Sequence, residues 1–166
     1  MKTLPLVSSG ETSRRSNLDE KPSLCHIVWA IEMAHAQRDV VTGRSVLILD
    51  SNLLDVLEAE SHLVRDGFRV SKLTGANGAL ARIEFEKPEV VLMDITMARL
   101  NVQELLEALR SDPELEEIVV VLFSNLDGPT LQQMCRENNI HGYFSKSMDI
   151  TRIGLFINQF FVEEEA

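Results

Sequence analysis

Four apolar segments of the chain each lead to a polar residue that could take part in chemistry: Asp50, Asp94, Ser124 and Lys146. The clearest case is Glu89–Met93, where four apolar residues in a row precede Asp94. An uninterrupted apolar run is typical of a strand that is buried on both faces of a parallel sheet. Such sheets bind their ligands at the carboxyl ends of the strands. We therefore expect these four side chains to converge at one edge of a sheet.

Together these residue types fit the handling of a phosphoryl group. An aspartate can accept a phosphoryl group as an aspartyl phosphate, while Mg²⁺ on carboxylates and a lysine neutralise its charge. A hydroxyl on a neighbouring strand can donate a hydrogen bond to the phosphoryl oxygens. Taken singly, Asp50 is more often a turn or cap residue, Ser124 is ordinary at a strand end and Lys146 is more often solvated. Their joint order favours a phosphoryl site.

Strands and helices alternate along the chain in a way that would place these residues at one edge. Apolar or alternating runs predict strands at 45–49, 68–73, 89–93, 118–123 and 142–144. Helical periodicity and capping residues predict helices at 52–66, 77–86, 101–110, 129–137 and 150–162. In the first of these helices we expect an inner face of Leu53, Val56, Leu57, Leu63 and Val64. Strict alternation predicts an α/β fold, a doubly wound five-stranded parallel sheet with helices on both faces.

The composition divides the chain into four parts. Residues 1–22 are polar and predicted to be disordered. Residues 23–42 are predicted to form an amphipathic helix and a linker, with Leu24, Ile27, Val28 and Ile31 on one face. The α/β domain covers residues 43–162, and residues 163–166 form an acidic tail.

Charge and hydropathy limit the classes of partner. The 166 residues carry a net charge of −10, which argues against direct contact with nucleic acid, since phosphates are bound by clustered Lys and Arg. No apolar run is long enough to cross a membrane, and the N-terminus lacks a signal-like apolar segment, so we expect a cytoplasmic protein. Cys25 and Cys135 are far apart in the sequence and are expected to be free thiols.

The chain resembles the receiver domains of two-component response regulators over residues 44–162. The matching segments are Val46-Leu47-Ile48-Leu49-Asp50, Val91-Leu92-Met93-Asp94 with Met97, Val121-Leu122-Phe123-Ser124 and Gly142-Tyr143-Phe144-Ser145-Lys146. The resemblance implies the flavodoxin-like (βα)5 receiver fold, here with an N-terminal extension.

The resemblance also implies a role for each matching residue. Asp94 would be the phosphoacceptor, and Lys146 would contact the phosphoryl group. Mg²⁺ would be held by Asp50, Asp94 and the main-chain carbonyl of Thr96. Ser124 would be the switch hydroxyl, and Tyr143 would be the aromatic residue that moves with it.

Three positions depart from the usual receiver pattern. Ser51 stands where a second acid normally follows Asp50, which predicts weaker binding of Mg²⁺. Ala98 and Ser147 stand where prolines usually follow Met97 and Lys146. Since proline at the second place normally fixes a cis bond, we expect a differently shaped loop after the last strand.

The function that follows is a single-domain response regulator of a phosphorelay, a signalling protein rather than an enzyme. A sensor histidine kinase or a phosphotransfer protein would donate the phosphoryl group, and a downstream protein, or a second copy in a homodimer, would receive the signal. Ser51 motivates an alternative, a phosphorylation-independent adaptor. A third hypothesis, an aspartate-nucleophile phosphatase, lacks support because Thr96 stands where that class needs its second acid.

Overall fold

The computed structural model describes residues 43–162 of the chain. The predicted disordered segment 1–22, the predicted helix and linker 23–42 and the acidic tail 163–166 lie outside the described residues. Within residues 43–162, no helix is long and apolar enough to cross a membrane.

Five parallel strands form one sheet in the order β2-β1-β3-β4-β5. The three inner strands are apolar and buried along almost their whole length, as the uninterrupted runs predicted. The strand β2 lies at one edge, which explains its alternating, half-exposed sequence. The bounds are β1 Ser45–Leu49, β2 Arg69–Leu73, β3 Val90–Met93, β4 Val119–Ser124 and β5 Gly142–Ser145.

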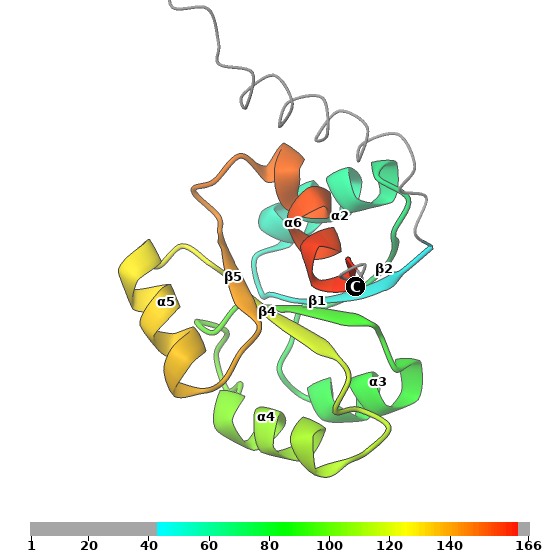
Figure 1. Cartoon of the computed structure of the whole chain (residues 1–166), viewed down its shortest axis with the longest axis vertical. Coiled ribbons are helices and arrows are strands. Elements are labelled where there is room, and N and C mark those ends of the chain that lie inside the picture. Colours follow the sequence, from blue (N-terminus) through cyan, green and yellow to red (C-terminus); the bar gives the residue numbers. More distant parts are fainter. Residues whose placement is uncertain (1–42, 163–166) are drawn as a thin grey trace, which may run out of the picture. The chain divides into compact units, whose positions relative to one another are not determined.

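Helices cover both faces of this sheet, which confirms the doubly wound fold (Figure 1). α2 (Leu53–Arg65) and α6 (Ile153–Asn158) pack on one face. α3 (Ala79–Glu86), α4 (Val102–Ser111) and α5 (Gly128–Glu137) pack on the other. Because side chains alternate along a strand, β1 sends Leu47 and Leu49 toward one core and Val46 and Ile48 toward the other.

The inner face of α2 differs from the one expected from the sequence. Val56, Ala59 and Leu63 are buried at i, i+3 and i+7. Leu53, Leu57 and Val64 were predicted to be inside, and they are exposed instead. The buried stripe of the helix therefore passes through the small Ala59, and the larger leucines lie outside it.

The last helical segment is not the continuous helix predicted for 150–162. A 3₁₀ turn, η1 (Ile150–Arg152), leads into α6, and a second 3₁₀ turn, η2 (Gln159–Phe161), follows it. Gly154 is packed so closely against α2 that an added Cβ would lie 2.3 Å from Asp66 Oδ2. The glycine lowers the helical propensity of this segment. It also allows the backbone of α6 to lie close to Asp66 at the end of α2.

Candidate functional site

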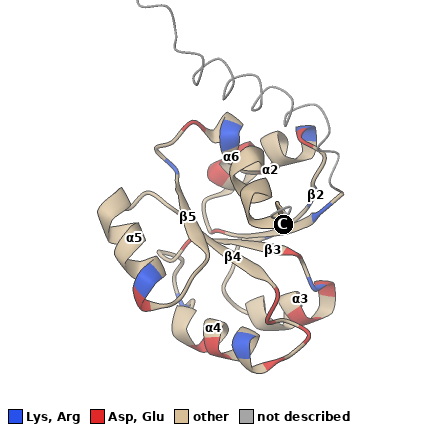
Figure 2. Cartoon of the chain, viewed as in Figure 1, with Lys and Arg blue, Asp and Glu red and all other residues tan. Residues whose placement is uncertain are grey.

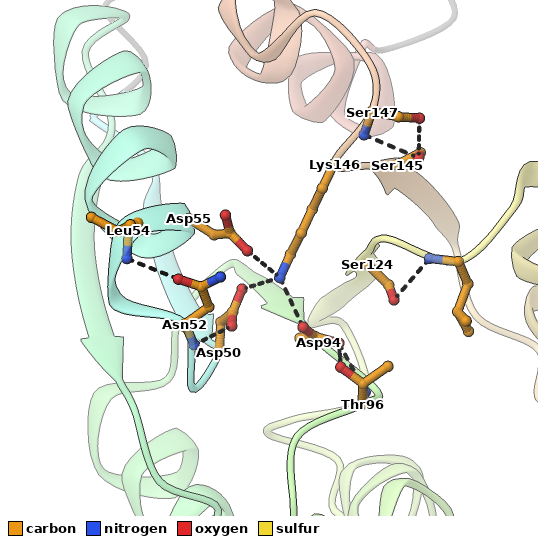
Figure 3. A network of polar contacts seen from close by, with 11 residues as sticks. Asp50, Asn52, Leu54, Asp55, Asp94, Thr96, Ser124, Ser145, Lys146 and Ser147 are labelled. Atoms are coloured by element: carbon orange, nitrogen blue, oxygen red, sulfur yellow. Dashed lines mark hydrogen bonds and ion pairs between the residues drawn. The ribbon is translucent and has the colours of Figure 1, made fainter.

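The ammonium group of Lys146 lies at the centre of the site, directly after β5. Its Nζ is 2.6 Å from Asp50 Oδ2, 2.8 Å from Asp94 Oδ2 and 2.8 Å from Asp55 Oδ2. Figure 3 shows the lysine extending between the ends of β1 and β3 toward these three carboxylates. The structure thus brings together Asp50, Asp94 and Lys146, as the strand-end argument predicted.

The alternation of side chains along the strands explains why these residues meet. Asp50 continues the alternate positions Val46 and Ile48, which face α2 and α6, and Asp94 likewise continues Val90 and Leu92. Both carboxylates are therefore directed toward the face on which the first turn of α2 lies. That turn carries Asp55.

Asp94 is held at both of its carboxylate oxygens. Oδ2 accepts a hydrogen bond of 2.8 Å from Lys146 Nζ. Oδ1 accepts hydrogen bonds from the backbone N–H (2.8 Å) and the hydroxyl (2.7 Å) of Thr96. Burial alone raises the pKa of Asp94, but the hydrogen bonds from Lys146 and Thr96 outweigh it and lower that pKa below its ordinary value. The carboxylate is therefore ionised at neutral pH, the form in which it is a nucleophile.

Asp50 is fully buried, with 0% of its surface exposed. Its Oδ1 accepts a hydrogen bond of 2.7 Å from Asn52 N–H, which fixes the turn between β1 and α2. Asn52 caps that helix by accepting the N–H of Leu54. The other oxygen, Oδ2, accepts no hydrogen bond and forms an ion pair with the Lys146 ammonium.

Lys146 is buried, since only 5% of its side chain is exposed. Burial alone lowers the pKa of Lys146, but the contacts with Asp50, Asp55 and Asp94 outweigh it and raise that pKa. The ammonium also lies 5.1 Å from the centre of the Phe123 ring. It is therefore a permanent positive charge at the point where the carboxylates converge.

Asp55 was missed by the sequence analysis. In the sequence it is an acid in the first turn of a helix, where acids are common because they interact favourably with the helix dipole. Its contact with Lys146 depends on how closely α2 approaches β5, which local sequence does not determine. The one available signal is that Asp55 stands in the first turn of the helix that follows, four residues after Ser51.

Ser124 and Tyr143 make no side-chain hydrogen bond or ion pair with this charged group, although Lys146 N–H donates a backbone hydrogen bond of 2.9 Å to the Ser124 carbonyl oxygen. Ser124 is fully buried, and its hydroxyl oxygen accepts a hydrogen bond of 3.4 Å from Leu126 N–H. Tyr143 packs partly buried against the core beneath α3, α4 and α5, with its hydroxyl beside Gly128. The two residues belong to the neighbouring strands β4 and β5. Both lie beside the connection from β4 to α5, Ser124 at Leu126 and Tyr143 at Gly128.

The turn after Lys146 is shaped by serines. Ser147 N–H donates to Ser145 Oγ at 3.3 Å, and the two hydroxyls are 2.8 Å apart. A proline at this place could not donate that hydrogen bond. The peptide bonds of residues 43–162 are all trans. The local hydrogen bonds of the serines thus close the turn that a proline usually shapes.

The donor set at this edge suits a hard divalent cation such as Mg²⁺, which prefers carboxylate oxygens. Two of the carboxylate oxygens, Asp50 Oδ2 and Asp55 Oδ2, are buried and accept no hydrogen bond. Within residues 43–162, no three acidic, histidine or cysteine side chains are already arranged to hold a metal ion. The Lys146 ammonium lies where the carboxylates converge, so a cation would share the pocket with it or shift it.

Comparison with known proteins agrees with this geometry. Residues 46–158 match the family model of the response regulator receiver domain. Protein PilH of Pseudomonas aeruginosa is 29% identical over 104 residues, which are 63% of this chain and 86% of PilH.

Solved structures show the same fold. The chemotaxis response regulator CheY4 of Vibrio cholerae superposes with a TM-score of 0.62 at 18% identity, covering 72% of this chain and 98% of CheY4. The Mn²⁺-bound form of the response regulator Rcp1 superposes with a TM-score of 0.57 at 18% identity, covering 74% of this chain and 97% of Rcp1. The chain described here belongs to the response regulator receiver domain family of two-component signalling.

Proposed function

We propose that the protein acts in a phosphorelay by accepting a phosphoryl group on Asp94. The observation that carries the proposal is the state of this carboxylate, which is ionised and held by Lys146 and Thr96 at the edge of the sheet. A carboxylate that served only as a helix cap would not need a buried lysine. The helix after β3 is capped by Asn101 instead, whose Oδ1 accepts the N–H of Glu104.

In the proposed reaction, a carboxylate oxygen of Asp94 attacks the phosphorus of a phosphohistidine on the donor protein. The new bond joins that oxygen to phosphorus, and the bond between phosphorus and the imidazole nitrogen breaks, leaving its electron pair on the imidazole. Lys146 offsets the negative charge that collects on the phosphoryl oxygens. Mg²⁺, held by the carboxylates of the pocket and by the Thr96 carbonyl, would neutralise the remaining charge.

The signal would pass from the site through Ser124 and Tyr143. The Ser124 hydroxyl can exchange its hydrogen bond with Leu126 N–H for one that it donates to a phosphoryl oxygen. This exchange would pull on the loop between β4 and α5 and free space beside Gly128 for the Tyr143 ring. The face formed by α5, β5 and the last helical segment would then present the altered surface to a partner.

The partners that fit this proposal are proteins. A sensor histidine kinase or phosphotransfer protein would supply the phosphoryl group in the cytoplasm, and a downstream protein or a second copy of the chain would read the result. Within residues 43–162, the basic residues lie on several separate elements rather than gathering on one, which does not favour nucleic acid (Figure 2). We propose no enzymatic activity toward small molecules.

The proposal is tested by incubating the protein with Mg²⁺ and a small phosphodonor and measuring its intact mass. We expect the mass of one phosphoryl group to be gained by the wild type and not by Asp94→Asn. Asp149→Asn, an equivalent change at an exposed aspartate outside the pocket, is the matched control and should keep the modification. No gain in the wild type, or an equal gain in Asp94→Asn, would contradict the proposal.

A second candidate is an adaptor that works without phosphorylation. It is favoured by Ser51, which removes an expected acid, and by Lys146, which already supplies a cation to the carboxylates. In this case Asp94→Asn would leave signalling in cells unchanged, while substitution of exposed residues such as Met148 or Val162 near the last helical segment would abolish it.

A further inference from the structure

We propose that Asp55 supplies the acidic pocket with the carboxylate that Ser51 lacks, so that Asp50, Asp55 and Asp94 together bind the divalent cation. This inference rests on the proposed function, because it concerns the metal that phosphorylation of Asp94 would use. It moves the second acid of the pocket from the loop after β1 to the first turn of α2.

The position of Asp55 is the first argument. Its Oδ2 is 2.8 Å from Lys146 Nζ, the same atom that contacts Asp50 and Asp94. Figure 3 shows Asp55 descending from α2 toward the pocket, on the side of Lys146 opposite to Thr96. Ser51, in contrast, is exposed. The pocket therefore has three carboxylates, as a receiver with two adjacent acids would have.

The turn between β1 and α2 explains why an acid at this place can reach the pocket. Asp50 Oδ1 accepts the N–H of Asn52, and Asn52 Oδ1 accepts the N–H of Leu54. These two bonds let the helix begin at Leu53, soon after the end of β1. The first turn of α2 is thereby held over Asp50, and Asp55 on its inner side faces the same space.

The unbalanced charge is the second argument. Three carboxylates surround one ammonium group, which leaves a formal charge of −2 in a largely buried pocket. Asp50 is completely buried, and its Oδ2 and the buried Oδ2 of Asp55 accept no hydrogen bond; both atoms share the one Lys146 ammonium with Asp94. Buried carboxylate oxygens are normally satisfied by hydrogen bonds or by cations. One divalent cation would balance the charge and use both oxygens.

An alternative role for Asp55 is to hold Lys146 in place without touching a metal ion. The two roles differ in what they predict for metal affinity. A clamp on Lys146 competes with the metal, so its removal would leave binding unchanged or strengthen it. A ligand contributes to binding, so its removal weakens it.

The test measures Mg²⁺ binding by calorimetry and Mn²⁺ binding by paramagnetic broadening of amide resonances, in the full chain. We expect Asp55→Asn to weaken the affinity for both ions about tenfold or more. Glu58→Gln, on the exposed side of the same helix, is the matched control and should bind as the wild type does. Ser51→Asp in the Asp55→Asn background should restore binding, because it returns an acid to the pocket.

The outcomes separate the two proposals. If Asp55→Asn binds the ions as tightly as the wild type while Asp50→Asn does not, Asp55 is not a ligand and the inference is overturned. The proposed phosphorylation of Asp94 then still stands. If the wild type binds neither ion at millimolar concentration and gains no phosphoryl group, both proposals are overturned.

Discussion

The parallel strands all begin at one side of the sheet, the amino edge, and end at the other, the carboxyl edge. Each of these two edges carries a charged cluster that joins β1 to β3, and the clusters differ in burial and in their number of carboxylates. At the amino edge, Arg44 Nη1 pairs with Glu89 Oε1 at 2.7 Å, and the two side chains are 30% and 40% exposed. At the carboxyl edge, the Lys146 ammonium faces three carboxylates and only 5% of its side chain is exposed. The first cluster is partly exposed to solvent, whereas the second has an excess of carboxylates and is largely buried.

The hydrogen bonds around the two clusters show the same difference. Glu89 Oε2 accepts the N–H of Ser45, and the Arg44 guanidinium lies 4.0 Å from the centre of the Phe161 ring. Glu89, just before β3, thus binds both Arg44 and the first residue of β1. At the carboxyl edge, buried oxygens of Asp50 and Asp55 accept no hydrogen bond. The cluster at the amino edge holds the starts of two strands together, whereas the cluster at the carboxyl edge keeps negative charge available for a ligand.

The largest effect should come from removing the Lys146 ammonium, which faces the three carboxylates of the pocket. Lys146→Ala leaves three carboxylates without a counter-charge, and we expect the free energy of unfolding in metal-free buffer to fall by about 3–5 kcal/mol. Arg44→Ala at the amino edge should cost about 1 kcal/mol or less, because that pair is half-exposed. Urea denaturation of both variants measures the difference. Equal losses of stability in the two variants would contradict the claim that the carboxyl edge depends more strongly on its cation.

Removing an acid should have an effect of a different sign at the two edges. Asp50→Asn keeps the oxygen that accepts Asn52 N–H and relieves repulsion from the other acids, so we expect it to be neutral or to stabilise by up to about 1 kcal/mol without metal. Glu89→Gln should destabilise by about 0.5 kcal/mol. Thermal unfolding in a chelating buffer makes the measurement. A loss of several kcal/mol in Asp50→Asn would show that Asp50 is a structural partner of Lys146 rather than surplus charge.

The two edges should also respond to acid in separate pH ranges. At the amino edge, His141 Nδ1 accepts the N–H of Val120 at 3.1 Å, which requires the neutral ring. Burial lowers the pKa of His141 below its ordinary value of 6.5, and the charge of Arg110 lowers it further. Since the unfolded chain takes up the proton first, this stabilisation is complete above pH 6.5 and is lost as the pH falls through the folded-state pKa.

At the carboxyl edge, the pKa of Asp94 lies below its ordinary value of 3.8, so its contribution is complete above that pH and is lost only in stronger acid. Denaturation at a series of pH values should therefore show a small loss of stability in the wild type as the pH falls below 6.5. His141→Asn keeps an acceptor for Val120 N–H and should remove that loss. His141→Ala should lower the stability at neutral pH by about 0.5–1.5 kcal/mol. An unchanged pH profile in His141→Asn would contradict the assignment.

The sequence predicted the fold and the strand-end residues because both depend on local pattern. Uninterrupted apolar runs identified β1, β3 and β4, and the polar residue after each run followed directly. The division of the chain into segments before residue 43 stays a prediction.

What could not be predicted depends on how elements pack. Asp55 reaches Lys146 because α2 lies close over the carboxyl edge, and the same packing turns Leu53 and Leu57 outward. The last helix is divided into three short pieces, and its middle piece carries Gly154, which packs closely against Asp66. The contacts of Asp55 with Lys146 and of Gly154 with Asp66 both join residues that are far apart in the sequence.

The central claim is that the carboxyl edge is a phosphoryl site built on Asp94. It is tested most directly by recording amide resonances of the ¹⁵N-labelled protein before and after addition of Mg²⁺ with beryllofluoride, which mimics an aspartyl phosphate. We predict large shifts at Asp94, Ser124 and Lys146 that spread to Tyr143 and α5, and none of these shifts in Asp94→Asn. Resonances that stay unchanged in the wild type would contradict the claim.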